Sequence, residues 1–191
     1  MQPIIYDVAV SIDGYISGPD EDISKFAQDG PVVDDYRARL ETYALAIMGR
    51  RTYEFGYRFG MQPGQNPYPH MATTVFSGAL ELPDDSEVAV SAPRDAKAIE
   101  GLKSTAGGPI YLCGGGVFAG WLLSLGLVDR LFLKRAPIVL GGGVQLFGGT
   151  STSPRLKHID SRDYGNGYLL QVFDVANPTN SGPGDPSVLR T

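Results

Sequence analysis

The chain has 191 residues, the usual length of one domain. With 42% apolar residues it can fill a hydrophobic core, so neither a disulfide nor a structural metal is needed, and its one cysteine cannot form an internal disulfide. A net charge of -5 argues against a nucleic-acid partner, because nucleic acids select basic surfaces.

Two segments bear on location. The N-terminal MQPIIYDVAVSIDG lacks a basic region and carries Asp7 within its apolar stretch, so it does not resemble a secretory signal, and we expect a cytoplasmic protein. Residues 107–128 have no charged side chain over 22 residues, which is long enough to span a bilayer. Their glycines would break a spanning helix, however, so this segment predicts a buried strand, a tight turn and a buried helix.

Apolar periodicity predicts the elements of the first half of the chain. Residues 3–12 alternate between two faces as in a strand, and Asp7 is the one charged residue within them. A loop containing glycines and Pro19 follows at 13–31. The pattern then predicts a helix at 33–43, a buried strand at 44–48, a helical turn at 51–57, a loop at 60–69, and strands at 73–77 and 88–91.

The second half predicts a helix that begins at Pro93 and ends at glycines 107–108. After it come a strand at 110–113, a helix at 116–125, a strand at 128–133 and a hairpin of strands at 156–164 and 167–175. Strands that alternate with helices and close with strands predict an α/β fold with a largely parallel sheet and an antiparallel edge. We therefore expect one domain at 1–175 and a tail at 176–191, docked on this chain or on a neighbour.

The strongest motif is IYLCGGGVFAGWLL at 110–123, a buried strand that runs into three glycines and an apolar helix. Glycines let a ligand approach the backbone, and the first N–H groups of a helix favour an anion such as pyrophosphate. The alternative is a tight buried turn without a ligand. The usual dinucleotide fingerprint is absent, because Ala119 occupies the place of its third glycine.

A second motif, AIMGRRTYE at 46–54, places Arg50, Arg51 and Thr52 directly after a buried strand. Guanidinium groups suit phosphate oxygens, and open α/β sheets bind ligands at the carboxyl ends of their strands. The alternative is a solvated arginine pair at the start of a helix. Two anion-binding candidates in one chain favour a dinucleotide, and the loop SIDGYISG at 11–18 could cover it as a lid.

These motifs, together with TTVFSGAL and APIVLGGGVQLF, occur in an order that resembles the dihydrofolate reductase-like superfamily. The closest resemblance is to the RibD C-terminal domain, the reductase domain of riboflavin biosynthesis, and it covers about residues 3–175. It implies a three-layer α/β fold with a central mixed, mostly parallel sheet and flanking helices. It also implies NADPH as the cofactor, a small-molecule substrate and a homodimer.

The resemblance implies cofactor-binding roles by position. One stretch would hold the 2′-phosphate and pyrophosphate of NADPH, one residue would lie beside the adenosine, and two backbones would hold the carboxamide of the nicotinamide. These are Gly49, Arg50, Arg51 and Thr52; Ser77; and Ala9 and Ile16. A glycine turn that often contains a cis Gly-Gly peptide would lie against the diphosphate and nicotinamide, namely Gly114, Gly115, Gly116, Val117 and Phe118.

The residues of the substrate half are open to more than one interpretation. The resemblance places Asp7 on the pocket side of the first strand, where its carboxylate would orient the substrate or relay a proton, or would be a satisfied structural group. Asp13 is the second catalytic candidate, and Tyr15 is comparable. Asp34 or Asp35 lies near the acidic residue of folate reductases, but the SxDG opening favours the riboflavin branch, so folate is disfavoured.

Other polar residues predict less chemistry. A substrate phosphate would meet Lys25, Arg37 or Arg58. Cys113 lies in a predicted core strand and is interpreted as a small buried hydrophobe rather than a nucleophile. The two histidines are far apart in sequence and have no cysteine partners, so no metal is expected.

The sequence thus predicts an NADPH-dependent reductase that transfers hydride to a small polar heterocycle, or to a related imine or carbonyl. The reaction would resemble that of 5-amino-6-(5-phosphoribosylamino)uracil reductase in riboflavin biosynthesis. One alternative is a nucleotide-binding sensor that has lost turnover. Another is a homo-oligomeric protein on the same fold that binds no dinucleotide.

Overall fold

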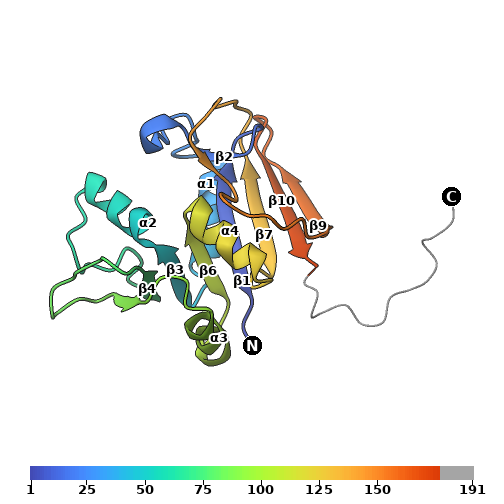
Figure 1. The fold of residues 1–191 in the computed structure, drawn as a ribbon. Helices are drawn as coiled ribbons and strands as arrows, with labels where there is room; N and C mark the ends of the chain where they lie inside the picture. The colour runs from blue at the N-terminus through green and yellow to red at the C-terminus, as the bar shows by residue number, and fades with distance from the viewer. Residues whose placement is uncertain (177–191) are drawn as a thin grey trace, which may run out of the picture.

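The computed structural model describes residues 1–176, so nearly all of the predicted tail lies outside the described residues. An eight-stranded sheet forms the centre of the molecule, in the order β5-β4-β3-β6-β1-β7-β10-β9 (Figure 1). Its strands are β1 (Ile4–Val10), β3 (Leu45–Gly49), β4 (Ala72–Phe76), β5 (Ala89–Ser91), β6 (Ile110–Gly114), β7 (Arg130–Arg135), β9 (Leu156–Asp163) and β10 (Leu169–Val175).

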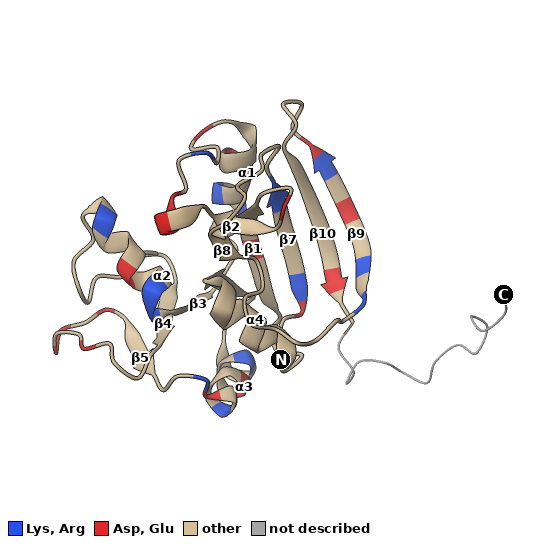
Figure 2. Cartoon of the chain, turned by 45° about the horizontal axis from the view of Figure 1, so that its top comes forward, with Lys and Arg blue, Asp and Glu red and all other residues tan. Residues whose placement is uncertain are grey.

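The sheet is mostly parallel with an antiparallel edge, as predicted. β1 pairs in parallel with β6 and β7, and β3 pairs in parallel with β4 and β6. The hairpin of β9 and β10 adds the antiparallel edge, because β10 pairs antiparallel with both β7 and β9. Every residue of β9 is exposed, and the colours of Figure 2 mark charged residues of both signs along it. Charges on an edge strand oppose pairing with another chain.

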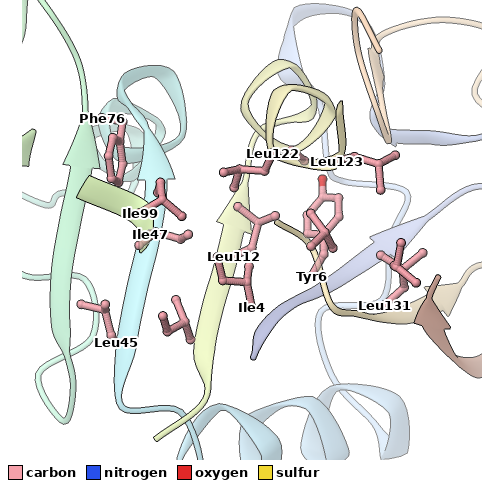
Figure 3. Packing of buried hydrophobic residues seen from close by; sticks show 14 residues of the cluster. Ile4, Tyr6, Leu45, Ile47, Phe76, Ile99, Leu112, Leu122, Leu123 and Leu131 are labelled. Carbon is pink, nitrogen blue, oxygen red and sulfur yellow. The ribbon is translucent and has the colours of Figure 1, made fainter. Parts of the chain in front are cut away.

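Four helices cover the sheet: α1 (Pro31–Leu40), α2 (Arg50–Phe55), α3 (Ala96–Thr105) and α4 (Gly116–Ser124). Two short 3-10 turns, η1 (Pro19–Glu21) and η2 (Gly56–Phe59), complete the described helical segments. The alternation of β1 explains the layers: Ile4 and Tyr6 pack on one face with residues of α3 and α4, as Figure 3 shows, and Ile5 packs on the other face with residues of α1 and α2. This is a three-layer α/β arrangement.

The segment without charges at 107–128 forms β6, a glycine turn and α4, as predicted. Within residues 1–176, none of the helices combines the length and hydropathy that a membrane crossing requires. The predicted start of the third helix is wrong by a few residues. It begins at Ala96 because Asp95 caps it, accepting a hydrogen bond of 3.0 Å from the N–H of Ala98, whereas Arg94 has a φ of 55°.

A separate two-stranded ribbon of β2 (Tyr15–Ser17) and β8 (Val144–Gln145) was not predicted. Two glycines allow backbone segments to approach closely here. A Cβ atom on Gly143 would lie 2.1 Å from the carbonyl oxygen of Ser17, and one on Gly116 would lie 1.9 Å from the carbonyl oxygen of Gln145. The ribbon therefore fixes the segment after β1 against the start of α4.

Candidate functional site

Two adjoining cavities lie at the carboxyl ends of the parallel strands, where α/β sheets bind ligands. The larger has a volume of about 630 Å³ and the smaller about 370 Å³. They share four lining residues, Val8, Ile16, Ile23 and Cys113, so the two cavities meet at the ends of β1 and β6. A ligand in one cavity can therefore contact a ligand in the other.

The larger cavity brings together most of the residues predicted to bind a dinucleotide. They come from the ends of β3 and β6, the starts of α2 and α4, and β2. They are Ile16, Gly49, Arg50, Arg51, Thr52, Gly115, Gly116, Val117 and Phe118. Segments far apart in the chain thus converge on one cavity because parallel strands end at the same edge of the sheet.

Three of the predicted residues lie elsewhere. Ala9 lines the smaller cavity. Ser77 lines neither cavity, and its hydroxyl accepts hydrogen bonds from the N–H groups of Ala79 and Leu80 at 3.1 and 2.9 Å. Gly114 lines neither cavity but is joined to Gly115 by a cis peptide bond, the feature that the resemblance implied.

Sequence reasoning missed several residues of the larger cavity. Arg94 adds a third arginine to Arg50 and Arg51. Phe76 stacks on Phe118 with ring centroids 5.2 Å apart, and Trp121 follows at 5.6 Å from Phe118. Of the two missed aromatic residues, Phe76 is the last residue of β4 and Trp121 lies within α4, so both stand in apolar stretches that predict core positions rather than a cavity wall.

The larger cavity is suited to an anion. Arg50 has an exposed side chain, 3.7 Å from Glu54 between its Nε atom and the carboxylate. No side chain caps the start of α4, and the N–H groups of residues 116–118 have no acceptor within residues 1–176. Free N–H groups and the positive end of the helix dipole attract negative charge. The donor set therefore fits a pyrophosphate with an additional phosphate at the arginines.

The smaller cavity has mainly apolar and aromatic walls over a charged floor. Its rings come from three tyrosines and one phenylalanine, namely Tyr36, Tyr111, Tyr168 and Phe26. Asp7 and Lys134 form the floor, and Arg37 is the other lining residue with a positive charge. Planar compounds suit such walls.

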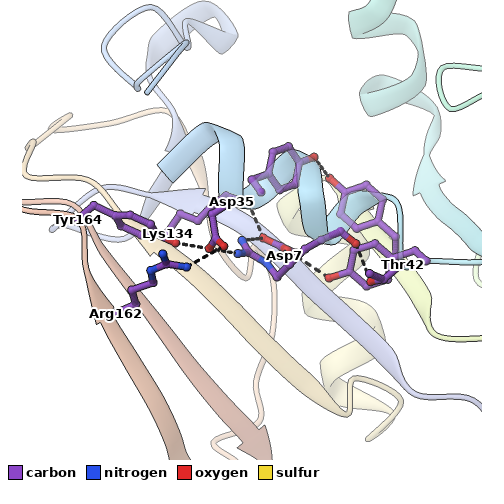
Figure 4. A network of polar contacts seen from close by, with 10 residues as sticks. Asp7, Asp35, Thr42, Lys134, Arg162 and Tyr164 are labelled. Atoms are coloured by element: carbon purple, nitrogen blue, oxygen red, sulfur yellow. Dashed lines mark hydrogen bonds and ion pairs between the residues drawn. The ribbon is translucent and has the colours of Figure 1, made fainter. Parts of the chain in front are cut away.

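Asp7 is the centre of a polar network (Figure 4). Its fully buried carboxylate accepts hydrogen bonds from Lys134 Nζ at 2.5 Å, Arg39 Nε at 2.8 Å and the hydroxyl of Tyr43 at 3.2 Å. Arg39 continues the network to Asp35, which also binds Arg162. Lys134 and Arg39 are 127 and 32 residues from Asp7 in the chain, which is why the sequence did not reveal them.

Comparison with known proteins gives the family. Residues 2–170 match the RibD C-terminal domain. The chain belongs to the RibD C-terminal domain family. The uncharacterized protein YyaP of Bacillus subtilis is 25% identical over 182 residues, covering 89% of this chain and 93% of YyaP.

Solved structures agree with this RibD-type assignment. A protein of Shewanella sp. PV-4, provisionally described as a riboflavin biosynthesis protein, has a TM-score of 0.77 at 25% identity, covering 92% of this chain and 99% of that one. Dihydrofolate reductase of Enterococcus faecalis, solved with NADP(H), has a TM-score of 0.64 at 16% identity, covering 91% and 96%. The RibD domain thus has the predicted dihydrofolate reductase-like fold, and its family and neighbours indicate an oxidoreductase.

The second catalytic candidate of this RibD domain, Asp13, lines neither cavity. Its exposed carboxylate accepts hydrogen bonds from the Ser11 hydroxyl at 2.6 Å and from the N–H groups of Leu140 and Gly141 at 3.1 and 2.7 Å. The Ser11 bond, with help from the backbone donors, lowers the pKa of Asp13 to about 2. These contacts tie the loop after β1 to the loop before β8.

We expect Asp13→Asn to lower the melting temperature at pH 7. Because the folded pKa of about 2 lies below the ordinary value of 3.8, the carboxylate stabilises the fold above pH 3.8 and loses this effect as the pH falls through about 2. The difference in melting temperature between wild type and variant should therefore disappear on acidification. Scanning calorimetry between pH 7 and pH 2 checks this, and a difference independent of pH contradicts it.

Cys113 lies in β6 as predicted but is half-buried rather than buried, because the strand ends beside both cavities. Desolvation of the thiol raises its pKa, and the Sγ atom lies 3.1 Å from the hydroxyl of Tyr68.

Among the predicted phosphate-binding residues, Arg37 lines the smaller cavity. Lys25 and Arg58 line neither, and Arg58 pairs with Glu21 at 3.1 Å.

Proposed function

We propose that this RibD-type domain is an NADPH-dependent reductase that transfers hydride to a small polar heterocycle, or to a related imine or carbonyl. One observation carries the proposal: a large basic cavity adjoins a smaller aromatic one, and they share Val8, Ile16, Ile23 and Cys113. A two-substrate reaction needs such neighbouring sites. The family match and the reductase fold support the same conclusion.

In this proposal the larger cavity binds the cofactor. Arg50 and Arg51 bind the 2′-phosphate, the free N–H groups at the start of α4 bind the pyrophosphate, and Ile16 holds the carboxamide near the shared residues. Bound NADPH supplies the hydride. The protein positions the two reactants and excludes water from the shared region.

The smaller cavity binds the substrate. A planar ring would lie against the aromatic walls of this cavity, and Arg37 would meet a phosphate of a riboflavin-type substrate such as 5-amino-6-(5-phosphoribosylamino)uracil. Asp7 lines the same cavity, so its carboxylate would act next to the substrate, where it would orient the substrate or relay a proton. The catalytic role of Asp13 and the homodimer stay predictions.

A titration with NADPH and NADH, followed by nicotinamide fluorescence, tests the cofactor half. We expect Arg50→Gln combined with Arg51→Gln to weaken NADPH binding by at least about tenfold and NADH binding by less, since hydrogen bonds to charged groups contribute about 1.5–3 kcal/mol each. NADH lacks the 2′-phosphate that these side chains would contact.

Arg130→Gln is the matched control. Arg130 has a similarly exposed side chain and pairs with Asp174 at 2.7 Å, but it lines neither cavity, so its loss should leave both affinities unchanged. If the wild type binds neither nucleotide, the proposal that the protein is a reductase is rejected. Stoichiometric NADPH binding without oxidation by any substrate would favour the sensor instead.

A further inference from the structure

Lys134 holds an unusual position in the smaller cavity. It lies near the end of β7, its side chain is only 8% exposed, and it lines the cavity floor beside Asp7. Its Nζ atom lies 3.7 Å from the centroid of the Tyr36 ring and 2.5 Å from Asp7 Oδ1. A buried ammonium group therefore faces the space assigned to the substrate.

The ammonium group of Lys134 has one N–H donor without a hydrogen-bond partner within the described residues. Within residues 1–176, Lys134 Nζ donates one hydrogen bond, to Asp7, and a second N–H group can face the Tyr36 ring. An ammonium group has three N–H donors, so one remains for a ligand in the cavity. Its partner in a substrate must be an acceptor atom, such as an imine nitrogen or a carbonyl oxygen.

Burial favours release of the Lys134 proton, whereas the charges around this side chain act in opposite directions, since Asp7 opposes the release and Arg39 favours it. The charged groups are Asp7 on β1, Arg39 on α1 and Asp35, which pairs with Arg39. The neighbouring elements also carry uncharged titratable groups, namely the hydroxyls of Tyr36, Tyr43 and Tyr111 and the thiol of Cys113. Asp7 is thus shared between two cations. Burial lowers the pKa of Lys134, whereas arginine does not lose its proton in proteins.

Resting on the proposed function, we propose that Lys134 is the proton donor of the reduction and that Asp7 is its positioning residue. Reduction of a C=N or C=O bond adds a hydride to carbon and a proton to nitrogen or oxygen. The hydride comes from NADPH, which leaves as NADP⁺. An N–H bond of Lys134 breaks, the nitrogen or oxygen of the substrate gains the proton, and the neutral amine regains a proton from water after the product leaves.

This assignment narrows the substrate class. The acceptor atom must be directly bonded to the carbon that receives the hydride, and both must fit over Lys134 between aromatic walls. A small, planar, conjugated imine or carbonyl meets these conditions. An isolated carbon–carbon double bond does not, because it offers Lys134 no acceptor.

Nitrogen NMR of lysine side chains tests the donor without any substrate. In the complex with NADPH, the signal that disappears in Lys134→Met should titrate at lower pH than the other lysine signals. A value equal to that of the exposed lysines would overturn the proposal.

Single-turnover oxidation of NADPH tests the step itself. The probes are 5-amino-6-(5-phosphoribosylamino)uracil, dihydrofolate, benzaldehyde and a cyclic aromatic imine. With whichever probe the wild type reduces, Lys134→Met should lower the rate by about 100-fold or more, as for other general acids, with the dissociation constant of NADPH unchanged. The wild-type rate should fall at high pH as Lys134 loses its proton, and in Asp7→Asn this fall should move to lower pH.

Lys103→Met is the matched control, because Lys103 is also 8% exposed and lies 2.5 Å from a carboxylate, that of Asp129, yet lines neither cavity. Its rate should stay close to wild type even if its stability falls. A Lys134→Met variant as fast as this control would overturn the donor role alone. A wild type that binds NADPH but reduces no probe would overturn the proposed function and the donor role together.

Discussion

Asp7→Asn should lower the free energy of unfolding by about 3–5 kcal/mol, the usual effect of removing one partner of a buried ion pair. The carboxylate of Asp7 has no exposed surface and receives hydrogen bonds from Lys134 and Arg39. Asparagine keeps the shape but leaves both cations without this counter-ion. Urea denaturation at pH 7 measures the loss, and a change below about 1 kcal/mol would contradict the importance of the network.

The loss in Asp7→Asn should also depend on pH. Burial already lowers the pKa of Lys134 from 10.5 in the folded protein, and without Asp7 we expect it to fall further. A cation with a depressed folded pKa destabilises the fold below that pKa, and the effect is relieved as the pH rises towards the unfolded value. The gap to wild type should therefore narrow from pH 6 to pH 9. The double variant with Lys134→Met should regain part of the stability, because the uncompensated ammonium is gone.

Gly116→Ala should raise the dissociation constants of the nucleotides by about tenfold or more. This is the effect expected from losing hydrogen bonds to a charged group. The added Cβ atom would lie 1.9 Å from the carbonyl oxygen of Gln145, a backbone atom that cannot turn aside. The start of α4 must then move, and with it the free N–H groups at 116–118 that line the larger cavity. Nucleotide titration and thermal unfolding of the variant measure the two effects.

Gly101→Ala is the matched control for this substitution. Gly101 lies in α3, and apart from its chain neighbours and the nearby backbone of its own helix, no atom lies within 4 Å of the Cβ atom that alanine would add. Alanine should stabilise that helix by about 0.5–1 kcal/mol and leave nucleotide binding unchanged. Normal binding by Gly116→Ala would show that the contact between α4 and β8 is not needed for the cavity.

Much of the fold could be predicted because its signals are local. Alternation placed β1, and the glycines around α4 marked its two ends, so both elements agree with the structure within a few residues. The start of α3 could not be placed from Pro93 alone, since Asp95 supplies the cap. β8 has two residues and pairs with residues 15–17, so no periodicity could reveal it.

The candidate site also contains residues that local sequence signals predicted and residues that only the folded structure reveals. Arg50, Arg51 and the glycine turn follow directly after buried strands, and their grouping in one cavity follows from the ends of parallel strands. Lys134 gave no signal, because a lysine in the apolar stretch LFLKRA reads as an exposed strand residue. Its burial depends on Asp7 and Tyr36, which only the folded chain brings together.

The pairing of β2 with β8 has a consequence for synthesis on the ribosome. Ile16 and Val144 both line the larger cavity, and they come from strands that pair across most of the chain. A growing chain therefore cannot complete this cavity before residue 145 has emerged and the long loop has closed. A ligand stabilises only the state that it binds, so earlier intermediates must remain folded or protected without help from the cofactor. Substitutions that weaken β1, β3 or β6 should accordingly reduce the yield of the protein in cells even when the cofactor is abundant.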